Sequence, residues 1–272
     1  MPLRDRLPSL STLKLLLEQR ARRLVRPARL GTLRRTSPLS DAWGFDRGTP
    51  IDRHYIDRFL GAHQQDIRGR LLEVRDTRYA ERFGPPDAPV DVLDIDPENW
   101  RATILADLAA ADAIPSERFD CFLLVQTLQY IRDVPAALRH TRRILRPGGV
   151  VLAVVPGVQR SDPAYLDGDY WRFTRASCQA LFGEAFGASA VTVTPYGNVL
   201  SCIASLSGLA AQELRHDELT TSDPSFPVYL FGVRAEYARP TADDAGAPGL
   251  EPVPAGRARG LRAARPRPRE EP

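Results

Sequence analysis

Residues 119–156 read FDCFLLVQTLQYIRDVPAALRHTRRILRPGGVVLAVVP, and the fold class follows mainly from this stretch. Phe119–Val125 and Val150–Val155 are almost uninterrupted apolar runs, which is typical of strands that are buried on both faces of a parallel sheet. Between them, Val134–Leu145 has the apolar spacing of a helix, and a Pro-Gly-Gly turn ends it. A strand, a helix and a strand in this order predict an α/β sheet covered by helices.

The same alternation extends toward both ends of the chain. It predicts seven strands in total, in a parallel sheet with helices on both faces. The further helices are expected at 51–62, 176–186 and 199–213, and the further strands at 70–74, 90–95, 103–105, 190–194 and 227–237.

Composition predicts one core with loose ends. A chain of 272 residues with 43% hydrophobic residues can bury one substantial domain, which we place at residues 41–237. Residues 1–40 form a basic amphipathic extension, with ten basic side chains against Asp5 and Glu18 before residue 36. It either packs on the domain edge or contacts a membrane surface or a protein partner. Residues 238–272 have almost no large apolar side chains and are predicted to be disordered.

Charge and cysteine usage exclude several classes of protein. The net charge of +3 gives no reason to expect nucleic acid as a partner. The three cysteines lack C-x-x-C spacing, and the histidines share no pattern with acids, so neither disulfides nor a metal site is expected. No apolar run is long enough to span a membrane. These features predict a cytoplasmic protein.

Four segments carry a resemblance to a known family. TILADL at 103–108, IPSERFD at 114–120, LLVQTLQYI at 123–131 and RILRPGGVVLAVVP at 143–156 follow one another at the expected separations. Together they resemble the class I S-adenosylmethionine-dependent methyltransferases, in particular the type 11-like domain. The resemblance implies a Rossmann-like, doubly wound sheet of seven strands, mostly parallel with an antiparallel last strand. It also implies S-adenosylmethionine as the cofactor.

The resemblance assigns cofactor contacts to residues at the strand ends. It implies that Glu73 ends the first strand in the place of the motif's acid, and that Asp94, with Asp96 as the alternative, accepts hydrogen bonds from the ribose. Asp107 is expected beside the adenine, and Gln126 at the end of the fourth strand is expected to position a ligand. For both Asp94 and Asp107 a turn or a helix N-cap is the competing structural role.

The first motif departs from the family pattern. Its glycine-rich loop is replaced here by Arg75, Asp76, Thr77 and Arg78, and the next glycine is Gly84. Either the unusual loop still holds the cofactor, with Arg75 or Arg78 pairing with its carboxylate, or it fills the pocket. In the second case the domain is a catalytically inactive scaffold or regulatory module.

The segment GDYWRFT at 168–174 is the candidate acceptor site. Tyr170, Trp171 and Arg172 suit a sugar or another flat polar acceptor, because rings stack on apolar faces while charges bind hydroxyls. Asp169 is the first candidate base and His54 the second. An aromatic anchor that packs the segment on the sheet is the competing role for Trp171.

The segment before the first strand suggests a biological setting. Residues 43–56 resemble the corresponding segment of methyltransferase-like proteins that are encoded beside bacterial glycosyltransferases. Arg47 and Arg53 in this segment are candidates for binding an anionic substrate group. The leading hypothesis is therefore a methyltransferase acting on a small molecule or glycan, and the alternative is an inactive relative in bacterial glycan assembly.

Overall fold

The computed structural model describes Lys14, Leu17, Gly31, residues 34–221 and residues 229–238. Most of the predicted N-terminal extension and nearly all of the predicted disordered tail therefore lie outside the described residues. Within the described part of the chain, no helix combines the length and the apolar character needed to cross a membrane.

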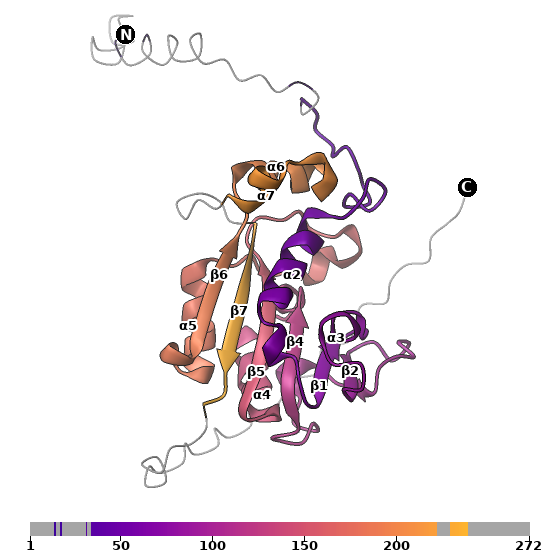
Figure 1. Ribbon diagram of the computed structural model, residues 1–272, viewed down its shortest axis with the longest axis vertical. Helices are drawn as coiled ribbons and strands as arrows, with labels where there is room; N and C mark the ends of the chain where they lie inside the picture. Colours follow the sequence, from indigo (N-terminus) through magenta and orange to yellow (C-terminus); the bar gives the residue numbers. More distant parts are fainter. Residues whose placement is uncertain (1–13, 15–16, 18–30, 32–33, 222–228, 239–272) are drawn as a thin grey trace, which may run out of the picture. The chain divides into compact units, whose positions relative to one another are not determined.

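The seven strands form one sheet, in the order β3-β2-β1-β4-β5-β7-β6 (Figure 1). All neighbouring pairs from β3 to β5 are parallel, whereas β7 is inserted antiparallel between β5 and β6. The predicted Rossmann-like sheet with an antiparallel last strand is confirmed. The strands are β1 (Leu71–Val74), β2 (Val90–Asp94), β3 (Ile104–Leu105), β4 (Phe119–Val125), β5 (Leu145–Pro156), β6 (Val191–Tyr196) and β7 (Leu230–Glu236).

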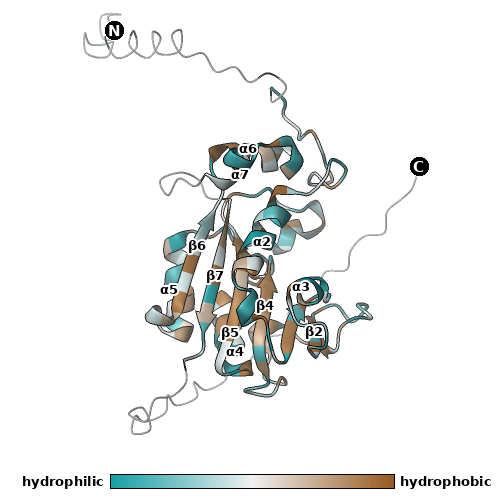
Figure 2. Cartoon of the chain, in the orientation of Figure 1, coloured by the Kyte–Doolittle hydropathy of each residue, from teal (hydrophilic) through white to brown (hydrophobic). Residues whose placement is uncertain are grey.

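Helices cover both faces of the sheet and give it two apolar cores. Because side chains alternate along a strand, Phe122 and Leu124 of β4 join the core under α4 and α5, while Cys121 and Leu123 join the core under α2 and α3. Figure 2 shows apolar residues concentrated along the central strands. The described helices are α2 (Ile51–Ala62), α3 (Arg78–Phe83), α4 (Val134–Ile144), α5 (Arg175–Phe186), α6 (Val199–Ser207) and α7 (His216–Thr220).

The largest correction to the predicted elements concerns residues 199–213. The predicted single helix ends as α6 at Ser207, because Gly208 adopts the left-handed conformation with φ of 73°. A separate short helical turn follows at Ala211–Glu213. The helices α3 and α7 were not predicted, since six and five residues are too short for a periodic apolar pattern.

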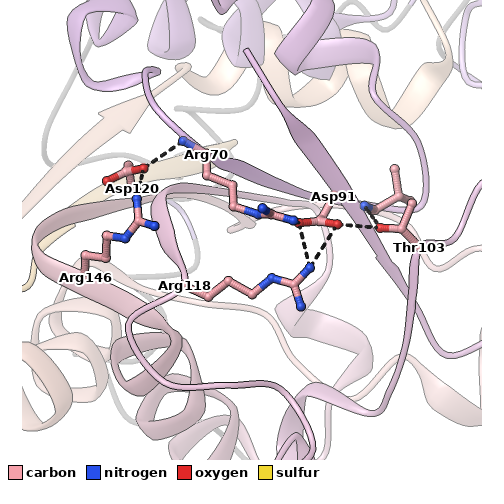
Figure 3. A network of polar contacts seen from close by, with 7 residues as sticks. Arg70, Asp91, Thr103, Arg118, Asp120 and Arg146 are labelled. Atoms are coloured by element: carbon pink, nitrogen blue, oxygen red, sulfur yellow. Dashed lines mark hydrogen bonds and ion pairs between the residues drawn. The ribbon is translucent and has the colours of Figure 1, made fainter.

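A charged network joins the strands at their amino ends (Figure 3). Asp91 on β2 accepts hydrogen bonds from Arg70, Arg118 and Thr103, and its side chain is mostly buried. Burial alone would raise the pKa of Asp91, but the hydrogen bonds from Arg70 and Thr103 outweigh it and the pKa is lowered. The network ties the starts of β1, β2 and β4 together, at the edge opposite the candidate site.

We expect Asp91→Asn to lower the free energy of unfolding by about 2 kcal/mol at pH 7, because both guanidinium groups lose their carboxylate. The pKa of Asp91 is lower in the folded state, so its contribution is present above the ordinary aspartate pKa of 3.8 and is lost as the pH falls below it. Urea unfolding at pH 7 and pH 3 measures this. The exposed Asp87, replaced in the same way, is the control, and an Asp91 effect that persists unchanged at pH 3 would contradict the expectation.

Candidate functional site

The carboxyl ends of β1, β2, β3 and β4 lie along one edge of the sheet, because these strands are parallel. Between β1 and β4 the strand order reverses, since β2 and β3 follow on one side and β5 on the other. Open α/β sheets bind ligands outside the carboxyl ends of the strands at such a switch point. The fold therefore brings Glu73, Arg75, Asp94, Asp107 and Gln126 to one edge.

Glu73 is buried inside this edge, with 2% of its surface exposed. Its two carboxylate oxygens accept hydrogen bonds from the backbone N–H groups of Tyr79 and Ala80, at 3.0 and 2.8 Å. These groups belong to the first turn of α3, whose free N–H donors need acceptors. Burial raises the pKa of Glu73 to about 7, although the two backbone hydrogen bonds lower it.

Two residues beside the switch point have a backbone conformation that is unusual for their type. Arg75, directly after β1, has φ of 77°, and Gln126, directly after β4, has φ of 50°. A left-handed conformation costs a non-glycine residue roughly 1–2 kcal/mol, and such strain clusters at functional sites. Arg75 therefore keeps the backbone conformation that a glycine would adopt easily.

The side chains of the loop after β1 differ in their exposure. Those of Arg75 and Arg78 are exposed, and Arg78 lies 3.5 Å from Asp76 in an ion pair. Tyr79 instead packs into the core beneath α2. The prediction that residues 75–79 pack into the crevice stays a prediction, since the two arginines are exposed and Tyr79 is buried.

Asp94 ends β2 and is held in one orientation. Its Oδ1 accepts the backbone N–H groups of Ile95 and Asp96, and its Oδ2 accepts the side-chain amide of Asn99 at 2.6 Å. The same amide also donates to the carbonyl of Arg75 at 2.8 Å. A carboxylate has about four acceptor positions, so roughly one remains for a ligand hydroxyl. Asn99 was not predicted, because no local pattern links it to the loop after β1.

Asp107 follows β3 and is exposed. Its carboxylate accepts the backbone N–H of Ala109 at 2.8 Å and caps a short helical turn. Asp107 therefore has the competing structural role of a helix N-cap. Two apolar side chains near these acids are also exposed, namely Ile95 by 69% and Leu105 by 57%. They offer an apolar surface beside Asp94 and Asp107, which was not predicted because both residues resemble ordinary strand residues.

The candidate acceptor segment lies against the turn after β4. The backbone N–H groups of Tyr170 and Trp171 both donate to the carbonyl of Gln129. The Gln129 side chain in turn donates to Gln126 Oε1 at 2.9 Å. Hydrogen bonds thus connect Gln126 to the segment that follows β5. Tyr170 and Trp171 stay 49% and 43% exposed, whereas Phe173 is buried in the core.

Asp169 and Arg172 form a two-point ion pair in this segment. Arg172 donates from both terminal nitrogens to both Asp169 oxygens, at 2.5 and 2.7 Å. This pairing lowers the pKa of Asp169 below its ordinary value. A carboxylate held in this way is a poor proton acceptor, and the geometry disfavours the predicted role of Asp169 as a base.

His54 lies on α2, the helix that precedes β1. Burial lowers its pKa, and the charged groups that influence it are Arg58, Asp57 and His216. Its Nε2 is buried without a hydrogen-bond partner in the described part of the chain. The structure therefore keeps this imidazole neutral near pH 7 but does not bring it into contact with the other candidate residues. Among the described residues, no group of three or more His, Cys, Asp or Glu side chains could hold a metal ion.

Comparison with known proteins adds a family assignment. A family model described as "Methyltransferase domain" matches residues 36–185, which is more than half of the chain. No curated protein sequence matches this chain.

Several solved structures are similar in fold. The YcgJ protein from Bacillus subtilis is 14% identical, with a TM-score of 0.43 over 68% of this chain and 99% of its own. An S-adenosylmethionine-dependent methyltransferase from Archaeoglobus fulgidus is 10% identical, with a TM-score of 0.42 over 68% and 90%. Phosphoethanolamine N-methyltransferase 2 from Haemonchus contortus is 14% identical, with a TM-score of 0.46 over 68% and 53%.

Proposed function

Because the chain belongs to the methyltransferase-domain family, we propose that it transfers a methyl group to a small-molecule or glycan-type acceptor. The methyl donor of this family is S-adenosylmethionine. The observation that carries the proposal is the clustering of Glu73, Asp94 and Asp107 at the carboxyl edge, beside two strained residues that flank the switch point. A strained backbone of this kind persists only where the surrounding structure holds it in place, and it is common at functional sites.

The residues at the strand ends fit this donor. Asp94 keeps one acceptor position for a ribose hydroxyl, and the exposed Ile95 and Leu105 offer apolar contacts for an adenine ring. The side chains of Arg75 and Arg78 are exposed. When bound, S-adenosylmethionine supplies a methyl group activated on a sulfonium sulfur.

Tyr170 and Trp171 support a sugar-like acceptor. Trp171 is oriented by a hydrogen bond from its Nε1 to the Ile131 carbonyl at 2.9 Å, while 43% of its surface stays exposed. A fixed and exposed aromatic ring suits stacking against the apolar face of a sugar. Arg172 is occupied by Asp169, so we assign it to shaping this segment rather than to binding charge.

His54 is the better of the two candidate bases. Its lowered pKa keeps the imidazole neutral at pH 7, and its buried Nε2 has no hydrogen-bond partner within the described structure. Asp169, in contrast, has both oxygens on Arg172.

Calorimetric titration of the full-length protein with S-adenosylhomocysteine tests the donor site. We expect Asp94→Ala to weaken binding by roughly 10- to 100-fold, because a hydrogen bond to a charged group contributes about 1.5–3 kcal/mol. Asp96→Ala is the matched control, since this neighbouring aspartate is exposed and accepts a hydrogen bond from the backbone of Glu98. A larger loss of affinity in Asp96→Ala than in Asp94→Ala would show that Asp96 makes the ribose contact.

One observation favours the inactive alternative. Asn99 ties the carbonyl of Arg75 to Asp94, which closes the loop after β1 onto the end of β2. If the wild-type protein binds neither S-adenosylmethionine nor S-adenosylhomocysteine at millimolar concentration, the domain is a scaffold or regulatory module. The same titration thus separates the two functions.

A further inference from the structure

Helix α6 turns its large apolar side chains outward. Its exposed residues are all aliphatic, and between 39% and 43% of the surface of each is exposed: Val199, Leu200, Ile203 and Leu206. Their spacing places them on one side of the helix, which we call the α6 face. The buried residues of the same helix are small: Ser201, Cys202, Ala204 and Ser205. The usual arrangement of a surface helix, with its apolar side toward the core, is therefore reversed.

Contacts at the ends of α6 hold the helix in this orientation. Asn198 caps its start by accepting the backbone N–H of Ser201, and the Asn198 amide donates to the carbonyls of Glu218 and Thr221, both at 2.7 Å. A rotation that buried the α6 face would break these contacts. Single exposed apolar side chains are common in proteins, but a contiguous apolar surface marks contact with another apolar surface.

The α6 face adjoins the edge of the sheet that carries the candidate site. Strand β6 runs parallel to β5, because both pair antiparallel with β7. Helix α6 begins shortly after β6 ends, and so lies beyond the carboxyl ends of the parallel strands (Figure 1). A surface bound by α6 is therefore on the side of the domain where the acceptor of the proposed reaction would enter.

A strongly basic segment joins the domain at the end of α6. The backbone N–H of Leu39 donates to the carbonyl of Ser207, the last residue of α6, at 2.7 Å. Arg47 pairs with Glu213 in the turn that follows, with 2.9 Å between Nε and Oε2. The exposed Arg34 and Arg35 precede Leu39 by only a few positions, and ten basic residues stand against two acidic ones before residue 36. Positive charge is thus tethered beside the apolar face.

We propose that the α6 face, together with the basic segment before residue 36, docks onto an anionic lipid surface. The aliphatic side chains enter the boundary between headgroups and acyl chains, while the arginines contact the anionic headgroups. Stable attachment to a membrane surface takes two such signals, and this end of the domain carries both. A second copy of the chain suits the face less well, because a shared contact through α6 would bring two basic segments together. The proposal does not depend on methyl transfer.

Sedimentation of the full-length protein with lipid vesicles tests the apolar part. We expect the protein to bind vesicles of phosphatidylcholine mixed with phosphatidylglycerol. The double variant Leu200→Ser with Leu206→Ser is expected to bind them roughly 10- to 100-fold more weakly, because two apolar side chains no longer enter the lipid. Leu166→Ser is the matched control, since Leu166 is 63% exposed elsewhere on the domain, and its binding is expected to change less than about twofold. Circular dichroism of each variant confirms the fold.

A second pair of variants tests the charged part. Arg34→Gln with Arg35→Gln is expected to weaken binding to the same vesicles by roughly tenfold, because each arginine near an anionic surface adds to the attraction. The control removes two charges from exposed arginines outside this region, Arg68→Gln with Arg139→Gln, and is expected to bind as the wild type does. Vesicles of phosphatidylcholine alone, or a high salt concentration, should weaken binding of the wild type.

Three outcomes would overturn the proposal. Unchanged binding in the Leu200→Ser and Leu206→Ser variant, with a loss in the arginine variant, would show that the basic segment acts without α6. A wild type that ignores vesicles but dimerises in analytical ultracentrifugation, and loses the dimer in the leucine variant, would assign the α6 face to a second copy. A monomer that ignores vesicles would leave lipid out altogether. None of these results bears on donor binding, which the calorimetric titration measures separately.

Discussion

Glu73→Ala is expected to lower the free energy of unfolding by about 4 kcal/mol. The substitution leaves the N–H groups of Tyr79 and Ala80 without acceptors in a buried position and opens a cavity beneath α3. Because α3 then loses its contact with the end of β1, the loop at 75–78 loses its orientation as well. Denaturant unfolding at pH 4.5, where the contribution of Glu73 is greatest, measures the change. A loss below about 1 kcal/mol would show that water replaces the carboxylate.

The same carboxyl group makes stability depend on pH in a defined direction. Its folded-state pKa is raised from the ordinary 4.5 to about 7, so the folded protein holds this proton more tightly than the unfolded chain does. Stability from Glu73 is therefore greatest below about pH 4.5 and falls as the pH rises to about 7, by roughly 3 kcal/mol in total. The Glu73→Gln variant cannot ionise and lacks this slope. Parallel pH profiles of the two proteins would contradict the raised pKa.

Gly232→Ala is expected to lower the free energy of unfolding by about 3 kcal/mol, at the upper end of the usual cost of overpacking. A Cβ at Gly232 would lie 2.3 Å from Cδ2 of Phe59, whose side chain is completely buried. The ring must move, and it belongs to α2, the helix that carries Arg53 and His54. Thermal unfolding measures the stability, and weaker binding of S-adenosylhomocysteine is expected alongside.

Another glycine of the chain provides the control for this substitution. At Gly61 a Cβ would meet its nearest neighbour, the ring of Phe83, at 3.8 Å, which is ordinary contact. Gly61 lies within α2, where alanine is favoured over glycine, so Gly61→Ala is expected to be neutral or stabilising by up to about 1 kcal/mol. The pair Gly232→Ala with Phe59→Ala should destabilise less than the sum of the two, because the smaller side chain leaves room. Additive effects would mean that the two sites do not touch.

Most of the sheet could be predicted from local patterns. The apolar runs at Phe119–Val125 and 150–155 are confirmed as the buried strands β4 and β5, because burial on both faces leaves little freedom in residue type. The structure starts β5 earlier, at Leu145, which pairs with Phe119 before a register shift takes up the Pro-Gly-Gly turn. Thr174 caps the helix that follows, because its side chain accepts the backbone N–H of Ser177.

The candidate site could be predicted only in part. The acids at the strand ends follow from the strands themselves, since parallel strands present their carboxyl ends at one edge. The hydrogen-bond partners of those acids could not be predicted from the strands. Asn99, which orients Asp94, and Tyr79, which holds Arg53, lie 5 and 26 positions away from the residues that they contact.

The order of apolar and polar residues along the chain was enough to establish an α/β sheet, its seven strands and the resemblance to the methyltransferase family. Such patterns are readable because each strand or helix buries its own face, and that requirement repeats over a few residues. Which donors and acceptors remain for a ligand depended on the packing of distant segments. Glu73 is occupied by α3, Asp169 is occupied by Arg172, and Arg53 keeps a buried donor without an acceptor in the described structure. A hydrogen bond needs two groups within about 3 Å, and only the folded chain brings such groups together.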